Sequence, residues 1–190
     1  MFNRKAVFLD RDGTLINSIH RPNFPENSSH KKQITAPFTE DELRFVPKVY
    51  SALGKLKKEG FLRIMVTNQP DVAHGYMDEE VWQRIQKRVE DTLGLDAVYM
   101  CRHRSEDGCD RKKPSPKMLR DAEDNLGINL SQSWMIGDTS TDMQTGRAVG
   151  CRVVLVTHFY NMGLRDKEYD YRADSLMEAV EFIIDQNKQA

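Results

Sequence analysis

The sequence predicts an α/β fold, a three-layer sandwich in which helices cover both faces of a central parallel sheet. Short apolar runs alternate with amphipathic segments along most of the 190 residues. Such alternation is typical of repeated strand–helix–strand units, whose strands pair in parallel. A hydrophobic content of 39% in a chain of this length favours one globular domain over residues 1–190.

The predicted strands are short runs rich in valine, isoleucine, leucine and phenylalanine. In chain order they cover residues 5–9, 61–67, 97–100, 133–137 and 151–157. Each run is too short for a core helix and is followed by polar residues, glycine or proline. We therefore expect buried strands of a parallel sheet.

The predicted helices fill the gaps between these strands and follow the last one. They cover residues 47–59, 78–93, 115–126, 140–149 and 174–186. The first has Pro47 in its first turn, and the second carries an apolar stripe that starts at Val81 and Ile85. Glycine follows each of the first four, which is a common way for a helix to end.

One segment breaks this rhythm. Residues 17–43 are polar, contain three prolines and show no clear period. We expect a long loop there, and loops of this length in a compact domain are often functional. Its histidines and lysines, His20, His30, Lys31 and Lys32, could contact a substrate phosphate or simply be solvated.

Composition narrows the choice of partner and compartment. The net charge is −1, so no general attraction to nucleic acid or an anionic membrane is expected. No apolar run approaches the roughly 18 residues of a membrane span, and the first apolar run is too short for a signal peptide. The odd count of three cysteines favours a reducing compartment, so we expect a cytoplasmic protein, by default a monomer.

Polar residues stand where the predicted strands end. Asp10, Thr67 and Asp138 end or follow strands, and Lys113 lies in a loop before a helix. In open α/β sheets, ligands bind at the carboxyl ends of the strands. We therefore expect these four side chains to meet at one rim of the sheet.

The pair Asp10 and Asp12 favours metal-dependent phosphate chemistry. Residues two apart in extended chain face the same way, and two adjacent carboxylates repel each other unless a cation intervenes. Mg²⁺ prefers such oxygen ligands, and Asp138 could supply a third. The alternative for this pair is an ordinary turn after a strand.

These residue types permit nucleophilic catalysis on a phosphate. Asp10 would attack phosphorus and Asp12 would act as acid and base. Thr67, Asn68 and Lys113 would neutralise or bind the phosphate. Asp142 could face the same site or could be a first-turn helix acid that favours the helix dipole.

Four segments taken in order carry a resemblance to a known family. DRDGT at 10–14, VTN at 66–68, KKP at 112–114 and GDTSTD at 137–142 together resemble the haloacid dehalogenase (HAD) superfamily of phosphohydrolases. The resemblance implies a Rossmann-like sandwich and an aspartyl-phosphate intermediate. It also implies Mg²⁺ held by Asp10, the backbone carbonyl of Asp12 and Asp138, with Asp142 orienting Lys113 or metal-bound water. The gaps between the motifs leave no room for a separate cap domain.

The finer resemblance is to the group that contains D-glycero-D-manno-heptose bisphosphate phosphatase and histidinol phosphatase. It rests on residues 67–77, TNQPDVAHGYM, and residues 101–119, which begin CRHRSEDGCDRKKP. It implies a phosphatase for a small phosphorylated metabolite, with heptose 1,7-bisphosphate losing its 7-phosphate as the leading substrate and histidinol phosphate as the alternative. Lys112, a further predicted phosphate-binding residue, stands where the group has arginine. A non-enzymatic scaffold is disfavoured by the intact acidic pair.

The 101–113 loop resembles the group's zinc loop. Cys101, His103 and Cys109 match three of its four ligands, but the fourth position is Arg111. Structural zinc sites ordinarily have four protein ligands. The interpretation we favour is a degenerate loop held by hydrogen bonds, and the alternative is zinc with Asp107 or Asp110 as an oxygen ligand.

Overall fold

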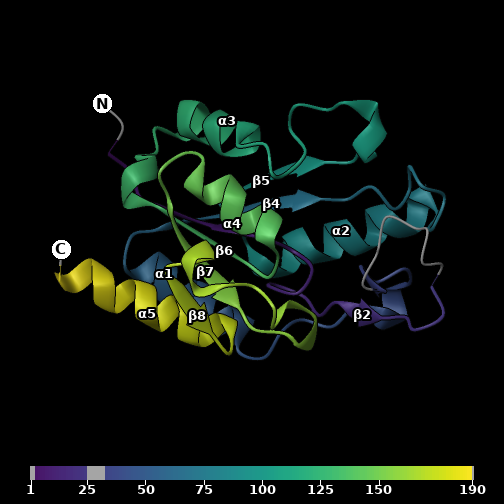
Figure 1. Ribbon diagram of the computed structural model, residues 1–190, viewed down its shortest axis with the longest axis horizontal. Coiled ribbons are helices and arrows are strands. Elements are labelled where there is room, and N and C mark those ends of the chain that lie inside the picture. The colour runs from purple at the N-terminus through teal and green to yellow at the C-terminus, as the bar shows by residue number, and fades with distance from the viewer. Residues whose placement is uncertain (1–2, 25–32, 190) are drawn as a thin grey trace.

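A six-stranded parallel sheet forms the centre of the protein in the computed structural model, which describes residues 3–24 and 33–189 (Figure 1). The strand order is β5-β4-β1-β6-β7-β8. In chain order these strands are β1 (Ala6–Leu9), β4 (Leu62–Asn68), β5 (Ala97–Cys101), β6 (Trp134–Gly137), β7 (Arg152–Val156) and β8 (Tyr171–Ala173). The five predicted strands are confirmed, and β8 at the edge is an addition.

Helices cover both faces of this sheet. They are α1 (Val49–Lys58), α2 (Glu79–Leu93), α3 (Lys117–Leu126), α4 (Ser140–Arg147) and α5 (Leu176–Gln189). Val7 and Leu9 point into one core with α1, α2 and α5, whereas Ala6 and Phe8 point into a second core with α3 and α4. This alternation follows from the two-residue period of a strand and confirms the three-layer sandwich.

The 17–43 segment is more ordered than the predicted loop. Within it β2 (Ile19–His20) pairs antiparallel with β3 (Ile34–Thr35), and a short 3-10 turn covers Glu40–Glu42. Arg21 explains much of this order, since its guanidinium lies 4.4 Å from the ring centre of Phe38 and donates to Glu42 at 2.5 Å. His30, Lys31 and Lys32 lie outside the described residues.

The described part of the insertion between β1 and α1 contains only this small sheet and the turn, so no cap domain is folded there, as expected. In residues 3–24 and 33–189, no helix combines the length and the apolar character that crossing a membrane requires.

Candidate active site

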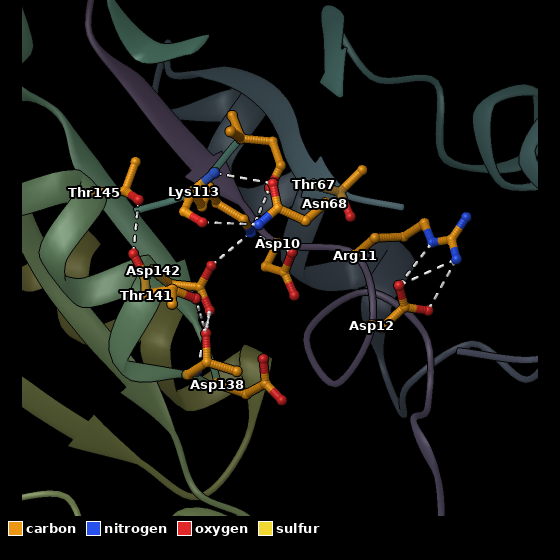
Figure 2. Close-up of polar contacts among 12 residues, drawn as sticks. Asp10, Arg11, Asp12, Thr67, Asn68, Lys113, Asp138, Thr141, Asp142 and Thr145 are labelled. Carbon is orange, nitrogen blue, oxygen red and sulfur yellow. Dashed lines mark hydrogen bonds and ion pairs between the residues drawn. The ribbon is translucent and has the colours of Figure 1, made fainter. Parts of the chain in front are cut away.

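A cleft of about 390 Å³ opens at the carboxyl ends of the central strands. Asp10 follows β1, Asn68 ends β4 and Asp138 follows β6, and all three line the cleft. Lys113 enters from the loop before α3 (Figure 2). The predicted convergence of polar side chains at one rim is thus observed for these residues.

Lys113 joins two of the motifs through its buried ammonium. Its Nζ donates to Asp10 Oδ1 and Asp142 Oδ1, each at 2.6 Å, and to the Val66 carbonyl at 2.9 Å. Burial lowers the pKa of Lys113, but the neighbouring charges of Asp10 and Asp142 outweigh burial and raise it above its ordinary value. The side chain therefore remains a cation at the edge of the cleft.

Asn68 fixes the backbone of Lys113. Its Oδ1 accepts from the Lys113 N–H at 3.0 Å, and its Nδ2 donates to the Lys113 carbonyl at 3.1 Å. Both polar groups of the Asn68 amide are thus engaged, although the residue also lines the cleft. Its observed role is to position Lys113.

Three carboxylates gather around this ammonium. Asp10, Asp138 and Asp142 are buried, and one oxygen of each lies within 4.8 Å of the others. Burial raises the pKa of Asp10 to about 7 against the opposing charge of Lys113. Burial, and then the charge of Asp10, raises the pKa of Asp138 as well. One ammonium therefore does not neutralise the cluster.

The donor set fits a hard divalent cation. Asp138 Oδ1 is buried and has no hydrogen-bond partner among the described residues, which leaves one carboxylate oxygen free inside the cluster. Mg²⁺ takes carboxylate oxygens and keeps several waters, so Asp10 and Asp138 could hold it beside the cleft. The residues present therefore fit the predicted magnesium site.

Asp142 combines the two roles that the sequence left open. Its Oδ2 accepts from Thr139 N at 3.0 Å and from Thr139 Oγ1 at 2.5 Å, which caps the start of α4. Its Oδ1 meets Lys113. A Cβ on Gly137 would lie 2.4 Å from Asp142 Cβ, so this close approach requires glycine.

The Asp12 carboxylate does not share the direction of Asp10, although both residues line the cleft. It accepts from Arg11 Nε and Nη2, both at 3.1 Å, and from Gln69 Nε2 at 2.5 Å. Figure 2 shows it turned toward Arg11 and away from Asp10. The reason is that β1 ends at Leu9, so strand alternation does not extend to Asp12.

Two other predicted phosphate ligands face elsewhere. Thr67 is buried at the end of β4, and its Oγ1 accepts from Gln69 Nε2 at 3.0 Å. Lys112 donates to the His103 carbonyl at 2.8 Å. Neither residue lines the cleft.

Sequence reasoning missed several residues of this site. Arg11 is buried beside Asp12 and donates to Gln86 Oε1 of α2 at 2.9 Å. Tyr160 lines the cleft and donates to Asp138 Oδ2 at 2.5 Å. The signal for Tyr160 was available, since it follows β7 shortly and the carboxyl end of β7 lies at the same rim.

The 101–113 loop brings its three expected ligand residues together. One ligand atom each from Cys101, His103 and Cys109 lies within 4.8 Å of the others. Arg111 does not complete the set, since its Nε lies 3.4 Å from Asp121 Oδ2.

Hydrogen bonds fix the same loop. Asp107 accepts from Arg104 N at 2.8 Å and from its Nη2 at 3.1 Å, so its carboxylate is already engaged. Together with the bond from Lys112 to the His103 carbonyl, these contacts favour a loop that needs no metal. Among the described residues, the group that could hold a metal here comprises Cys101, His103 and Cys109, one ligand fewer than structural zinc sites ordinarily have.

Known proteins resemble this chain in sequence and in fold. The sequence model of one family, described as HAD-hydrolase-like, matches residues 111–179. The chain is 31% identical to D-glycero-beta-D-manno-heptose-1,7-bisphosphate 7-phosphatase of Escherichia coli, over 97% of this chain and 96% of that protein. It is 34% identical to the Photorhabdus laumondii protein of the same name, over 80% of each. The structure resembles D,D-heptose 1,7-bisphosphate phosphatase from B. bronchiseptica complexed with magnesium and phosphate, with a TM-score of 0.77, 24% identity and coverage of 96% of this chain and 99% of that chain.

Proposed function

The chain belongs to the HAD-like hydrolase family of phosphatases, and we propose that it removes the 7-phosphate of D-glycero-β-D-manno-heptose 1,7-bisphosphate in an Mg²⁺-dependent reaction. The observation that carries the proposal is the buried cluster in which Lys113 bridges Asp10 and Asp142 beside Asp138. The cluster lies at the carboxyl edge of the sheet, where a phosphate can reach it from the cleft.

Asp10 is the nucleophile of the proposed reaction. Lys113 binds its Oδ1, while Oδ2 makes no hydrogen bond to a described residue and can attack phosphorus. The attack forms a bond from Asp10 Oδ2 to phosphorus and breaks the bond from phosphorus to the sugar oxygen. Water then cleaves the aspartyl phosphate and regenerates the carboxylate.

Charge neutralisation makes this attack possible, since both partners are anions. Mg²⁺ held by Asp10 and Asp138 would supply a Lewis acid for the phosphate oxygens. Lys113 holds its ammonium 2.6 Å from Asp10 Oδ1, the oxygen next to the attacking one, because Asp142 and Asn68 fix its head and its backbone. This preorganised cation reduces the repulsion that the incoming phosphate meets.

Asp12 is the acid and base in the proposal, and this role requires a rotation. Its side chain lines the cleft, but its carboxylate is held by Arg11 and Gln69. To protonate the leaving sugar oxygen, the carboxylate must leave these partners and turn into the cleft. Before substrate binds, Arg11 and Gln69 hold the Asp12 carboxylate in its resting position.

The substrate assignment is supported by the named relatives and by the size of the cleft. A volume of about 390 Å³ lies in the range of sites for small metabolites, roughly 300–1,000 Å³. A heptose bisphosphate is the first candidate, and histidinol phosphate or another phosphorylated metabolite is the alternative. Thr67 and Lys112 remain phosphate ligands in this proposal only if they turn toward the cleft.

We further propose a cytoplasmic monomer. Cys101, Cys109 and Cys151 are free thiols, as a reducing compartment would maintain. A net charge of −1 favours a small metabolite over nucleic acid as the partner.

Phosphate release tests the assignment. Purified protein with Mg²⁺ would be assayed on both heptose bisphosphate anomers, histidinol phosphate, common sugar phosphates and nucleotides. Strong preference for one heptose bisphosphate supports the full proposal, whereas a flat profile keeps the chemistry and rejects the substrate. Asp10→Asn should abolish release, and Asp124→Asn, an exposed aspartate on α3, is the matched control. Activity retained by Asp10→Asn would refute the nucleophile.

A further inference from the structure

Two contacts attach the segment after β7 to Asp138 of the acidic cluster, and a third attaches it to the loop after β1. Asn161 Nδ2 donates to the Asp138 carbonyl at 2.9 Å, and Tyr160 donates to Asp138 Oδ2 at 2.5 Å. His158 Nε2 lies 2.7 Å from the Gly13 carbonyl in the loop after β1. These contacts join the ends of β1, β6 and β7 around one carboxylate.

Tyr160 is held in a fixed orientation within this segment. Its ring stacks on His158, with centroids 4.9 Å apart and planes 5° from parallel. The edge of Phe159 packs against it at 5.3 Å. A Cβ on Gly13 would lie 2.7 Å from the Tyr160 hydroxyl, so the loop after β1 leaves room for the hydroxyl only because residue 13 is glycine.

The Tyr160 hydroxyl engages one of the two carboxylate oxygens of Asp138 and leaves the other available. Oδ2 is engaged by Tyr160, while Oδ1 is buried and has no hydrogen-bond partner in residues 3–24 and 33–189. A carboxylate in this state offers one oxygen to a cation. Mg²⁺ demands near-octahedral coordination by single oxygens, whereas Ca²⁺ accepts carboxylates through both oxygens and takes six to eight ligands.

We propose that Tyr160 is a positioning residue that restricts Asp138 to one-oxygen coordination and thereby makes the site select Mg²⁺ over Ca²⁺. The inference rests on the magnesium site of the proposed function. It gives a role to a residue outside the four motifs, in the segment after β7. Tyr160 contacts Asp138, which would bind the ion, and does not contact the ion itself.

The test measures metal binding directly and uses a matched tyrosine. Dissociation constants of Mg²⁺ and Ca²⁺ would be determined by titration calorimetry on the substrate-free wild type, Tyr160→Phe and Tyr171→Phe. Tyr171 also donates its hydroxyl to a carboxylate oxygen, Glu178 Oε1, at 2.7 Å. It lies in the edge strand β8 and does not line the cleft. Loss of a partner that orients a metal ligand typically weakens binding 10–100-fold.

In Tyr160→Phe, Mg²⁺ binding should weaken at least 10-fold, while Ca²⁺ binding stays within threefold or tightens. Tyr171→Phe should change neither constant.

Two results would overturn the inference while the phosphatase assignment stands. One is an unchanged ratio of the two constants in a folded Tyr160→Phe protein, with folding checked by circular dichroism. The other is a kcat that stays low at saturating Mg²⁺ although the Mg²⁺ constant is unchanged, which would assign Tyr160 to the substrate. A wild type that binds no Mg²⁺ would overturn both the inference and the metal dependence of the proposed function.

Discussion

Replacing Lys113 by methionine removes the ammonium that bridges Asp10 and Asp142. The Lys113 side chain is 3% exposed, and the two carboxylates are 10% and 1% exposed, so little water can replace it. Hydrogen bonds to charged groups contribute about 1.5–3 kcal/mol each, and breaking a buried ion pair on one side costs about 3–5 kcal/mol. We expect the free energy of unfolding to fall by about 3–5 kcal/mol. The cost is held to this range because the abandoned carboxylates can take up protons.

Lys112→Met is the matched control for this substitution. The Lys112 ammonium is half-buried and donates to a neutral carbonyl of His103, so its loss should cost only about 0.5–1.5 kcal/mol. Urea unfolding at pH 7 measures both variants. The double variant Lys113→Met with Asp142→Asn should regain part of the lost stability, because one of the two uncompensated carboxylates becomes neutral.

Activity separates the catalytic role of Lys113 from its structural one. Loss of one preorganised donor at the reacting phosphate should lower kcat by about 10²–10³-fold. The double variant should stay equally slow although it is more stable. Two results would contradict these expectations. One is a free energy of unfolding of Lys113→Met within about 1 kcal/mol of the wild-type value, and the other is a loss of stability and activity in Lys112→Met as large as that in Lys113→Met.

Three further predictions concern the same site and the neighbouring loop. Gly13→Ala should weaken Mg²⁺ binding and lower the melting temperature, because residue 13 has φ +84° and a Cβ there would lie 2.3 Å from Asp138 Oδ2. An unchanged Mg²⁺ dissociation constant and an unchanged melting temperature, both measured by calorimetry, would contradict this. Without metal, burial raises the pKa of Asp10 to about 7, so stability should be lost as pH rises through 7. Mg²⁺ should therefore raise the melting temperature more at pH 8 than at pH 5.5, and the opposite order would be contrary to the proposed metal site. The 101–113 loop should contain no stoichiometric zinc in protein purified without chelators, and one zinc per chain by elemental analysis would show that the loop has found a fourth ligand.

The core of the fold could be predicted because its signal is local. The strands β1 and β6 are apolar at every position, and they form the buried centre of the sheet. The edge strand β8 has no such signal. It is three residues long, Tyr171 and Arg172 are half-buried, and its pairing with β7 depends on where the preceding segment brings it.

The order inside the 17–43 segment could not be predicted for a different reason. Its two short strands pair through residues 19–20 and 34–35, which are separated by a long stretch of chain. What holds them includes the stacking of Arg21 on Phe38 and the packing of Phe24 against Tyr76, 5.0 Å between centroids. Such contacts between side chains distant in sequence leave no period for a pattern to reveal.

At the site, the sequence predicted which segments of the backbone lie close together better than it predicted where their side chains point. Lys112 and Lys113 are adjacent and chemically identical, and both were predicted from the sequence to bind phosphate. The structure separates them through Asn68, whose amide holds both backbone groups of Lys113 and aims its side chain at Asp10. The side chain of Lys112 consequently points to the opposite side, toward His103.

The orientation of the Asp12 carboxylate follows from the burial of Arg11 and bears on the reaction. Arg11 is 1% exposed, and a buried guanidinium must find acceptors. It finds Gln86 on one side and Asp12 on the other, and Gln69 adds a third bond to the same carboxylate. Because β1 ends at Leu9, strand alternation does not extend to Asp12, and its carboxylate meets the buried guanidinium of Arg11 instead.

The hydrogen bonds that hold the Asp12 carboxylate must break before Asp12 can act as an acid. If Asp12 protonates the leaving oxygen, its carboxylate must exchange two bonds from Arg11 and one from Gln69 for contacts in the cleft. The exchange is favourable only when a substrate supplies an oxygen that the carboxylate can meet, since an empty cleft offers water and the repulsion of Asp10 and Asp138. The acid would then be presented mainly to a bound substrate, and the resting site would keep its nucleophile and its acid apart.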